Sequence, residues 1–193
     1  MKKLFYNTNI ESLNYKGGNR KLDHTYYNAC CFLGHRKIEA SQELKDRLYK
    51  AIEMLITDKK VTSFLFGSKS QFDTLCHAIV TKLKEKYTYL ERIYVRAEFP
   101  YIDEHYKEYL SKSYEDTYYP DKILKAGRAV YIERNYEKIN KSNFCIIYYN
   151  KKYMPPKRKQ SKNQVAFYQP NSGTKLAYDY AIKKGLEMIN VFI

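Results

Sequence analysis

Two short glycine turns carry the residues best suited to bind an anion. The first, Gly67-Ser68-Lys69, follows the apolar run Val61 to Phe66, and the second, Ser172-Gly173-Thr174, precedes a stretch with helical periodicity. A helix N-terminus carries unpaired backbone N–H groups and about half a unit of positive charge, and glycine lets an anion approach that backbone closely. The two turns predict a pocket for a phosphate that belongs to a nucleotide. The alternatives are an ordinary strand-to-helix turn at Gly67 and a simple helix cap at Ser172 or the residue before it.

Two arginines elsewhere in the chain are candidate phosphate ligands. Arg36 ends the segment Gly34-His35-Arg36, which follows an apolar run, and an arginine there can clamp a phosphate through two parallel hydrogen bonds. Arg134, next to Asn135, can meet the same phosphate from a helix across the cleft. The alternatives are a surface salt bridge for Arg36 and a solvated helix face for Arg134.

Three side chains are candidates for acid–base catalysis. His35 is of the residue type that titrates near neutral pH, although the sequence offers it no carboxylate partner. Asp73 and His77 lie four residues apart on one predicted helix, where they can form either an oriented base or a helix-stabilising pair. Glu133 is the third candidate, as a catalytic acid.

One segment is suited to nucleic acid. The stretch from Lys151 to Lys162 contains six basic residues and no acidic one. Lys157, Arg158 and Lys159 can contact phosphates there, and nearby tyrosines can stack on bases; the alternative is a solvated loop. The six tyrosines between Tyr101 and Tyr119 can stack on a base, cover the sheet or form an oligomer interface.

Strand and helix patterns alternate in the part of the chain that must position these residues. Apolar runs predict strands at 29–33, 61–66 and 90–95, separated by two segments whose apolar residues recur every three or four positions, as in helices. Ser41 is expected to cap the first of these helices. This β-α-β-α-β order implies parallel strands joined by right-handed crossovers.

The second half of the chain continues the alternation. We expect a short helix near 104–113 and a loop, a helix at 131–141, a central strand at 144–149, a basic loop at 150–170, a helix at 174–184 and a last strand at 188–193. The helix at 131–141 should turn Ile132, Tyr136 and Ile139 inward, and Gly185 should end the helix at 174–184. The predicted fold class is α/β: a single Rossmann-like three-layer domain over 29–193, with a mostly parallel sheet and helices on both faces. Residues 1–28 are polar and are expected to form an N-terminal arm.

Composition limits the classes of partner. Among 193 residues, 35 Lys and Arg face 21 Asp and Glu, and the resulting formal charge of +14 favours nucleotides, nucleic acid or acidic proteins. The alternative is that codon usage, rather than function, makes the chain rich in lysine and tyrosine. We expect a cytoplasmic protein without membrane contact, because no apolar stretch suits a membrane span or a signal peptide. The spacing of Cys30, Cys31, Cys76 and Cys145 suits reduced, apolar cysteines and predicts no metal site. We also expect no required cofactor.

Several short motifs, taken in their order along the chain, resemble one known family. They are Cys31-Phe32-Leu33-Gly34-His35-Arg36, Phe66-Gly67-Ser68 with Asp73, Glu133-Arg134-Asn135, Ser142, and Ser172-Gly173-Thr174 with Asp179-Tyr180-Ala181. The set resembles the YpsA-like branch of the SLOG superfamily (SMF/DprA–LOG) and covers residues 29–193. The resemblance implies a Rossmann-like domain with a nucleotide pocket at the carboxyl edge of the sheet. Asp73 stands at the family's motif aspartate, which implies that it contacts the first glycine turn or its ligand. It also implies self-association, which is common among SLOG proteins.

The chain departs from the family pattern at several positions. A glycine pair and an alanine are replaced by Gly67-Ser68 and Lys69, and Gly-Gly-Thr is replaced by Ser172-Gly173-Thr174. Two motif aspartates appear as Asn140 and Asn143, so the pocket rim is less acidic and should accept a more anionic ligand. The glutamate of the phosphoribohydrolase branch is absent, because Ala177 stands at its spacing. This absence argues against that hydrolysis.

The expected function is the binding of a nucleotide or a nucleotide-derived ligand, as a sensor or a sequestering module. One alternative is an enzyme, a nucleotide N-glycosidase or phosphohydrolase that uses Glu133, Asp73 or His35. The other is nucleic-acid binding through the basic loop, as the DprA branch of the family implies.

Overall fold

The computed structural model describes residues 28–67, 69–153 and 172–193. The predicted N-terminal arm, Ser68 and most of the basic loop, including Lys157, Arg158 and Lys159, lie outside the described residues.

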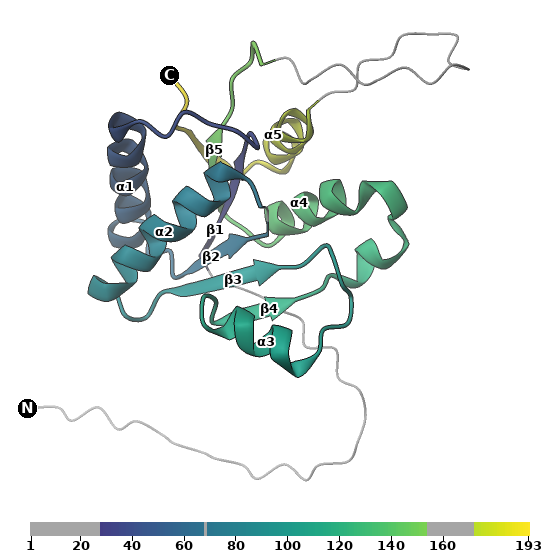
Figure 1. Ribbon diagram of the computed structural model, residues 1–193. Coiled ribbons are helices and arrows are strands. Elements are labelled where there is room, and N and C mark those ends of the chain that lie inside the picture. Colours follow the sequence, from purple (N-terminus) through teal and green to yellow (C-terminus); the bar gives the residue numbers. More distant parts are fainter. Residues whose placement is uncertain (1–27, 68, 154–171) are drawn as a thin grey trace, which may run out of the picture.

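One parallel sheet organises the described residues, with the strand order β4-β3-β2-β1-β5-β6 (Figure 1). Every neighbouring pair in it is parallel. The strands are β1 (Ala29–Gly34), β2 (Ser63–Phe66), β3 (Glu91–Val95), β4 (Asp116–Tyr118), β5 (Phe144–Tyr148) and β6 (Glu187–Asn190). The predicted α/β class with a parallel sheet is confirmed.

Helices cover both faces of this sheet and make three layers (Figure 1). α1 (Gln42–Thr57) and α2 (Gln71–Lys86) pack against the face that carries Phe32, Phe64 and Phe66. α4 (Val130–Asn140) and α5 (Gly173–Lys184) pack against the opposite face, which carries Cys31 and Leu65. α3 (Glu104–Ser111) lies between β3 and β4 in the chain, and the 3-10 turns η1 (Asp121–Lys125) and η2 (Gly127–Ala129) lead into α4.

Side-chain caps fix where the helices begin. Ser41, Ser70 and Ser172 each accept a hydrogen bond from the backbone N–H three residues later, at 3.3, 3.1 and 3.1 Å. Each such cap contributes about 1 kcal/mol. Gly185 ends α5 in the left-handed conformation, with a φ of 71°. The caps predicted at Ser41 and Gly185 are confirmed.

The sequence prediction missed β4 and placed a loop there. β4 has three residues and no apolar run, and it forms because its backbone pairs with β3 at Ile93 to Val95. The last strand also ends earlier than predicted, at Asn190.

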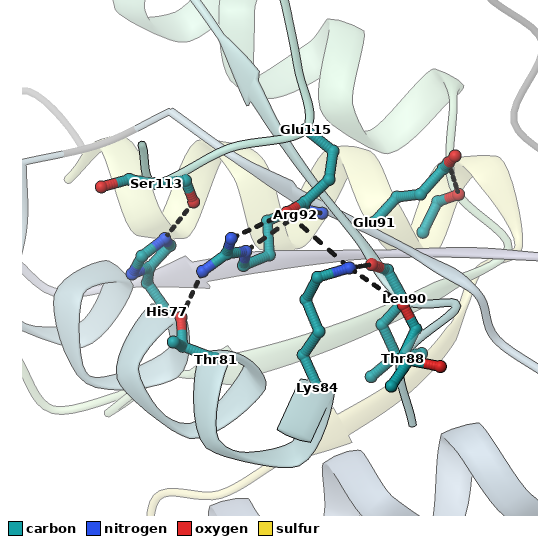
Figure 2. A network of polar contacts seen from close by, with 10 residues as sticks. His77, Thr81, Lys84, Thr88, Leu90, Glu91, Arg92, Ser113 and Glu115 are labelled. Atoms are coloured by element: carbon teal, nitrogen blue, oxygen red, sulfur yellow. Dashed lines mark hydrogen bonds and ion pairs between the residues drawn. The ribbon is translucent and has the colours of Figure 1, made fainter. Parts of the chain in front are cut away.

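A polar network at the amino end of β3 holds the edge of the sheet together (Figure 2). The buried guanidinium of Arg92 donates two hydrogen bonds to Glu115, with Nη2–Oε1 at 2.7 Å and Nε–Oε2 at 3.2 Å. Its Nη1 donates to the hydroxyl of Thr81 on α2, and Lys84 of the same helix donates to the carbonyl of Leu90. These contacts attach α2 and the segment before β4 to β3.

All four cysteines are free and buried, as expected for apolar packing residues. In the part of the chain that the structure describes, no helix is both long and apolar enough to cross a bilayer.

Candidate anion-binding site

The strand order reverses at β1, whose neighbours are β2 and β5. In open parallel sheets, ligands bind outside the carboxyl ends of the strands at such a reversal. β1 pairs with β2 only up to Cys31 and Leu65, whereas its pairing with β5 continues to Gly34. On the side that faces β2, the backbone N–H and C=O groups of β1 beyond Cys31 therefore have no strand partner and can bond to side chains.

Lys138 of α4 uses one of these groups. Its side chain is 0% exposed, and its Nζ donates a 2.7 Å hydrogen bond to the carbonyl oxygen of Phe32. The same Nζ lies 3.7 Å from Oδ1 of Asp73, a residue of α2. Lysine is almost never fully buried unless it is paired, so Lys138 depends on these two oxygen partners. Sequence reasoning missed it, although its spacing of four residues from Arg134 puts both cations on one face of α4.

Arg134 is the second buried cation, at 6% exposure. Its Nη1 donates to the carbonyl oxygen of Gly67, and its Nη2 lies 3.2 Å from the side-chain oxygen of Asn135. Its Nε atom is buried and has no hydrogen-bond partner. Burial lowers the pKa of the guanidinium, and the nearby carboxylate of Asp73 opposes that shift. The alternative of a solvated helix face is wrong for Arg134.

Asp73 completes what we call the buried charge cluster, made of Asp73, Arg134 and Lys138. It is 4% exposed, and its Oδ2 accepts the N–H of Gly67 at 3.3 Å. Among the carboxylates of the described residues, Asp73 alone is buried. The cluster thus holds two cations against one carboxylate. Buried charge is costly unless it is paired, so the excess positive charge favours the arrival of an anion.

Packing requires the glycines that follow β2 and end β1, Gly67 and Gly34. A Cβ on Gly67 would lie 2.5 Å from the carbonyl oxygen of Val95 and 2.9 Å from Cδ of Arg134. A Cβ on Gly34 would lie 2.3 Å from the ring of Phe72. The N–H of Gly67 donates to Asp73 and its C=O accepts from Arg134, so the backbone of this glycine is already engaged by the cluster.

A polar bridge lies beside Arg134. The carboxylate of Glu98 accepts from Nζ of Lys69 at 3.1 Å and from the hydroxyl of Tyr131 at 2.8 Å. These two hydrogen bonds hold the pKa of Glu98 below its usual value. The ring of Tyr131 lies 5.6 Å from the Arg134 guanidinium, so this bridge, called the Glu98 bridge below, borders the cluster.

His35 joins the turns after β1 and β5. Its Nε2 accepts the backbone N–H of Asn150 at 3.2 Å, and its ring lies 4.1 Å from that of Tyr153. Accepting that bond requires a neutral ring with the proton on Nδ1, and burial lowers the pKa of His35 in agreement. Arg36, by contrast, is exposed, and its carbonyl accepts the N–H of Gln71 at 3.0 Å.

The remaining candidates lie around these groups. His77 is 3.0 Å from the carbonyl oxygen of Ser113, whereas Asp73 contacts the first glycine turn, so the two point toward different partners. Glu133 is half-buried on α4. In the second turn, Ser172 caps α5, Thr174 is buried and Gly173 is exposed.

Gly173 differs from Gly67 in its surroundings. A Cβ at Gly173 would meet no atom within 4 Å, and no positive φ requires glycine there. Packing therefore explains the glycine of the first turn and leaves that of the second unexplained.

Comparison with known proteins finds no family model and no curated protein that matches this chain. The resemblance to SLOG proteins therefore rests on the motifs alone. A search of the described residues for three or more His, Cys, Asp or Glu side chains able to hold a metal ion finds none.

Proposed function

We propose that the chain binds an anionic, nucleotide-type ligand and that Arg134 holds its phosphate at the carboxyl ends of β1 and β2. The observation that carries the proposal is the buried charge cluster, in which two cations face one carboxylate and Nε of Arg134 has no partner. A phosphate oxygen is the kind of acceptor that a buried guanidinium N–H requires.

The place of the cluster supports the same proposal. It lies at the carboxyl edge beside β1, where the strand order reverses, and this is the usual ligand position in open α/β sheets. The nucleotide class follows from the motif resemblance and from the basic character of the chain. The fold alone does not assign a function, so the proposal rests on the site.

We propose binding without turnover, as a sensor or sequestering module. The Nε2 of His35 accepts a backbone N–H, and Asp73 accepts another next to the Lys138 ammonium. Both groups are therefore engaged in holding the fold. Chromatography of nucleotides before and after incubation tests the enzyme alternative, and the release of free base or phosphate would favour it.

Thermal unfolding with a panel of anions tests the binding proposal. The panel comprises inorganic phosphate, pyrophosphate, nucleosides and nucleoside mono-, di- and triphosphates. A ligand at about 100 times its dissociation constant adds roughly 2.7 kcal/mol of stability, which raises the Tm by about 5–10 °C for a chain of this size.

Two arginine variants make the test specific. Arg134→Met should reduce the shift by about half or more, because a ligand that binds tenfold more weakly adds only about half the stability at the same concentration. Arg92→Met should preserve the full shift, because Arg92 is also buried, at 9% exposure, but lies at the amino end of β3. An equal shift in both variants, or no shift with any anion, would overturn the proposal.

A further inference from the structure

Exposed aromatic rings gather beside the proposed phosphate site. Phe99 follows β3 and is 60% exposed, and its ring contacts that of Tyr106 on α3 in an edge-to-face arrangement with centroids 6.2 Å apart. Tyr106 in turn stacks on the exposed ring of Tyr109 at 6.0 Å. We call these three residues the aromatic cluster. The cluster follows β3 in the chain, and β3 is the neighbour of β2 in the sheet (Figure 1).

The backbone holds Phe99 in an unfavourable conformation. Its φ is 54°, in the left-handed region that bulky residues avoid. The guanidinium of Arg96 fixes this turn by donating to the carbonyl oxygens of Phe99 and Pro100, at 2.9 and 3.3 Å. The ring of Phe99 is thus not buried in a core, and its backbone is not in a favourable conformation. Neither packing nor backbone preference therefore explains a phenylalanine at this position. Local strain of this kind concentrates at binding sites.

The aromatic cluster is linked directly to the buried charge cluster. Glu98, the residue before Phe99, forms the Glu98 bridge with Lys69 and Tyr131. The ring of Tyr131 lies 5.6 Å from the guanidinium of Arg134. A ligand that contacts both clusters would therefore lie along this bridge.

The distribution of charged residues would orient such a ligand. The segment from Glu98 to Glu108, which includes the first turn of α3, carries four acidic residues and one lysine in a chain whose net charge is +14. Phosphates are repelled from this acidic segment and attracted to Arg134 and Lys138. Carboxylates accept hydrogen bonds from the amino groups of a base.

We infer that the aromatic cluster is a stacking platform for the heterocyclic base of the ligand, with Phe99 as its first contact. The inference rests on the proposed function, because it takes the phosphate of the same ligand to be held by Arg134. Stacking on an aromatic side chain tolerates any base, so the platform selects nucleotides over inorganic phosphate without choosing among bases.

Tryptophan fluorescence tests this inference in the full chain, which contains no tryptophan. The Phe99→Trp variant should show saturable quenching by a nucleotide and none by inorganic phosphate. Tyr89→Trp is the matched control, because Tyr89 is 56% exposed and contacts another ring at 6.3 Å but precedes β3 at the opposite end of the strand. Its fluorescence should not respond to the nucleotide.

Calorimetric titration of Phe99→Ala measures how much the ring contributes to nucleotide affinity. The variant should bind nucleotides roughly 5- to 150-fold more weakly, the loss expected for one stacked base, while its affinity for pyrophosphate stays unchanged. Equal losses for both ligands would overturn the platform, because they would indicate a disturbed phosphate site.

Other results separate this inference from the proposed function. If the natural chain binds nucleotides but Phe99→Trp is not quenched, the platform is wrong and the proposed function stands. If the natural chain binds no nucleotide, both are wrong. Self-association that Phe99→Ala abolishes, with unchanged nucleotide affinity, would instead assign the aromatic cluster to an interface between copies of this chain.

Discussion

The ammonium of Lys138 lies 3.7 Å from the carboxylate of Asp73, and neither side chain is more than 5% exposed. This pair connects α4 to α2, which cover opposite faces of the sheet, past the carboxyl end of β2. Because Arg134 adds a second cation beside the same carboxylate, the pair is part of a cluster with excess positive charge. The stability of the protein should therefore depend on anions in solution.

Replacing Asp73 by asparagine should expose that dependence. The variant leaves two buried cations without a buried carboxylate, which should cost about 3–5 kcal/mol of unfolding free energy. Phosphate should then stabilise Asp73→Asn more than it stabilises the natural chain. Thermal unfolding in phosphate and in chloride of equal ionic strength measures the difference, and equal stabilisation of both proteins would contradict the prediction.

Coupling between Lys138 and Asp73 should appear in a double-mutant cycle. Lys138→Met keeps a similar volume and removes the excess charge, so it should cost less than Asp73→Asn. The double variant should be more stable than the sum of the single effects by about 0.5–3 kcal/mol, as measured by urea unfolding. Additive effects would mean that the two groups do not interact in solution.

The two glycine turns should respond differently to alanine. Gly67→Ala brings a Cβ within 2.5 Å of the backbone oxygen of Val95, and overpacking of this kind costs about 1–3 kcal/mol. Gly173→Ala meets no neighbouring atom and should leave stability within about 0.5 kcal/mol. Chemical denaturation of both variants makes the comparison, and equal losses would mean that packing does not distinguish the two turns.

His35 should make the protein less stable in mild acid. Burial lowers its pKa in the folded state, so below the unfolded pKa of about 6.5 the unfolded chain binds a proton that the folded chain does not. Its contribution to stability is therefore present at neutral pH and is lost as the pH falls. The unfolding free energy of the natural chain should fall more between about pH 7.5 and 5.5 than that of His35→Phe. Parallel pH profiles for the two proteins would refute this role.

The sequence was sufficient for five of the six strands of the described sheet and for most of the elements that surround the site. Local signals determine these features: the apolar run of β2, the cap at Ser41 and the αL glycine at 185 all depend on neighbouring residues. The first glycine turn was also identified as a turn at the end of a strand. The reason why this turn needs glycine could not be predicted from the sequence, because Gly67 is constrained by the carbonyl of Val95, which lies on another strand.

The centre of the site could not be predicted in the same way. Ile139 of α4 is buried as its apolar character indicates, but so are its neighbours Lys138 and Arg134 on that helix. Long basic side chains are ordinarily assigned to solvent. The burial of Lys138 depends on the carbonyl of Phe32 and the carboxylate of Asp73. The burial of Arg134 depends on the carbonyl of Gly67. These partners are distant in sequence and adjacent only in the folded chain.

Calorimetric titration of nucleotides and pyrophosphate into three proteins tests whether Arg134 holds the phosphate. The natural chain and Arg92→Met should bind with the same affinity, since the guanidinium of Arg92 contacts Glu115 and Thr81 at the opposite end of β3. Arg134→Met should lose at least about tenfold in affinity, the effect of removing one charged hydrogen bond. Equal affinity of Arg134→Met and the natural chain would contradict the claim that the buried charge cluster is the anion site.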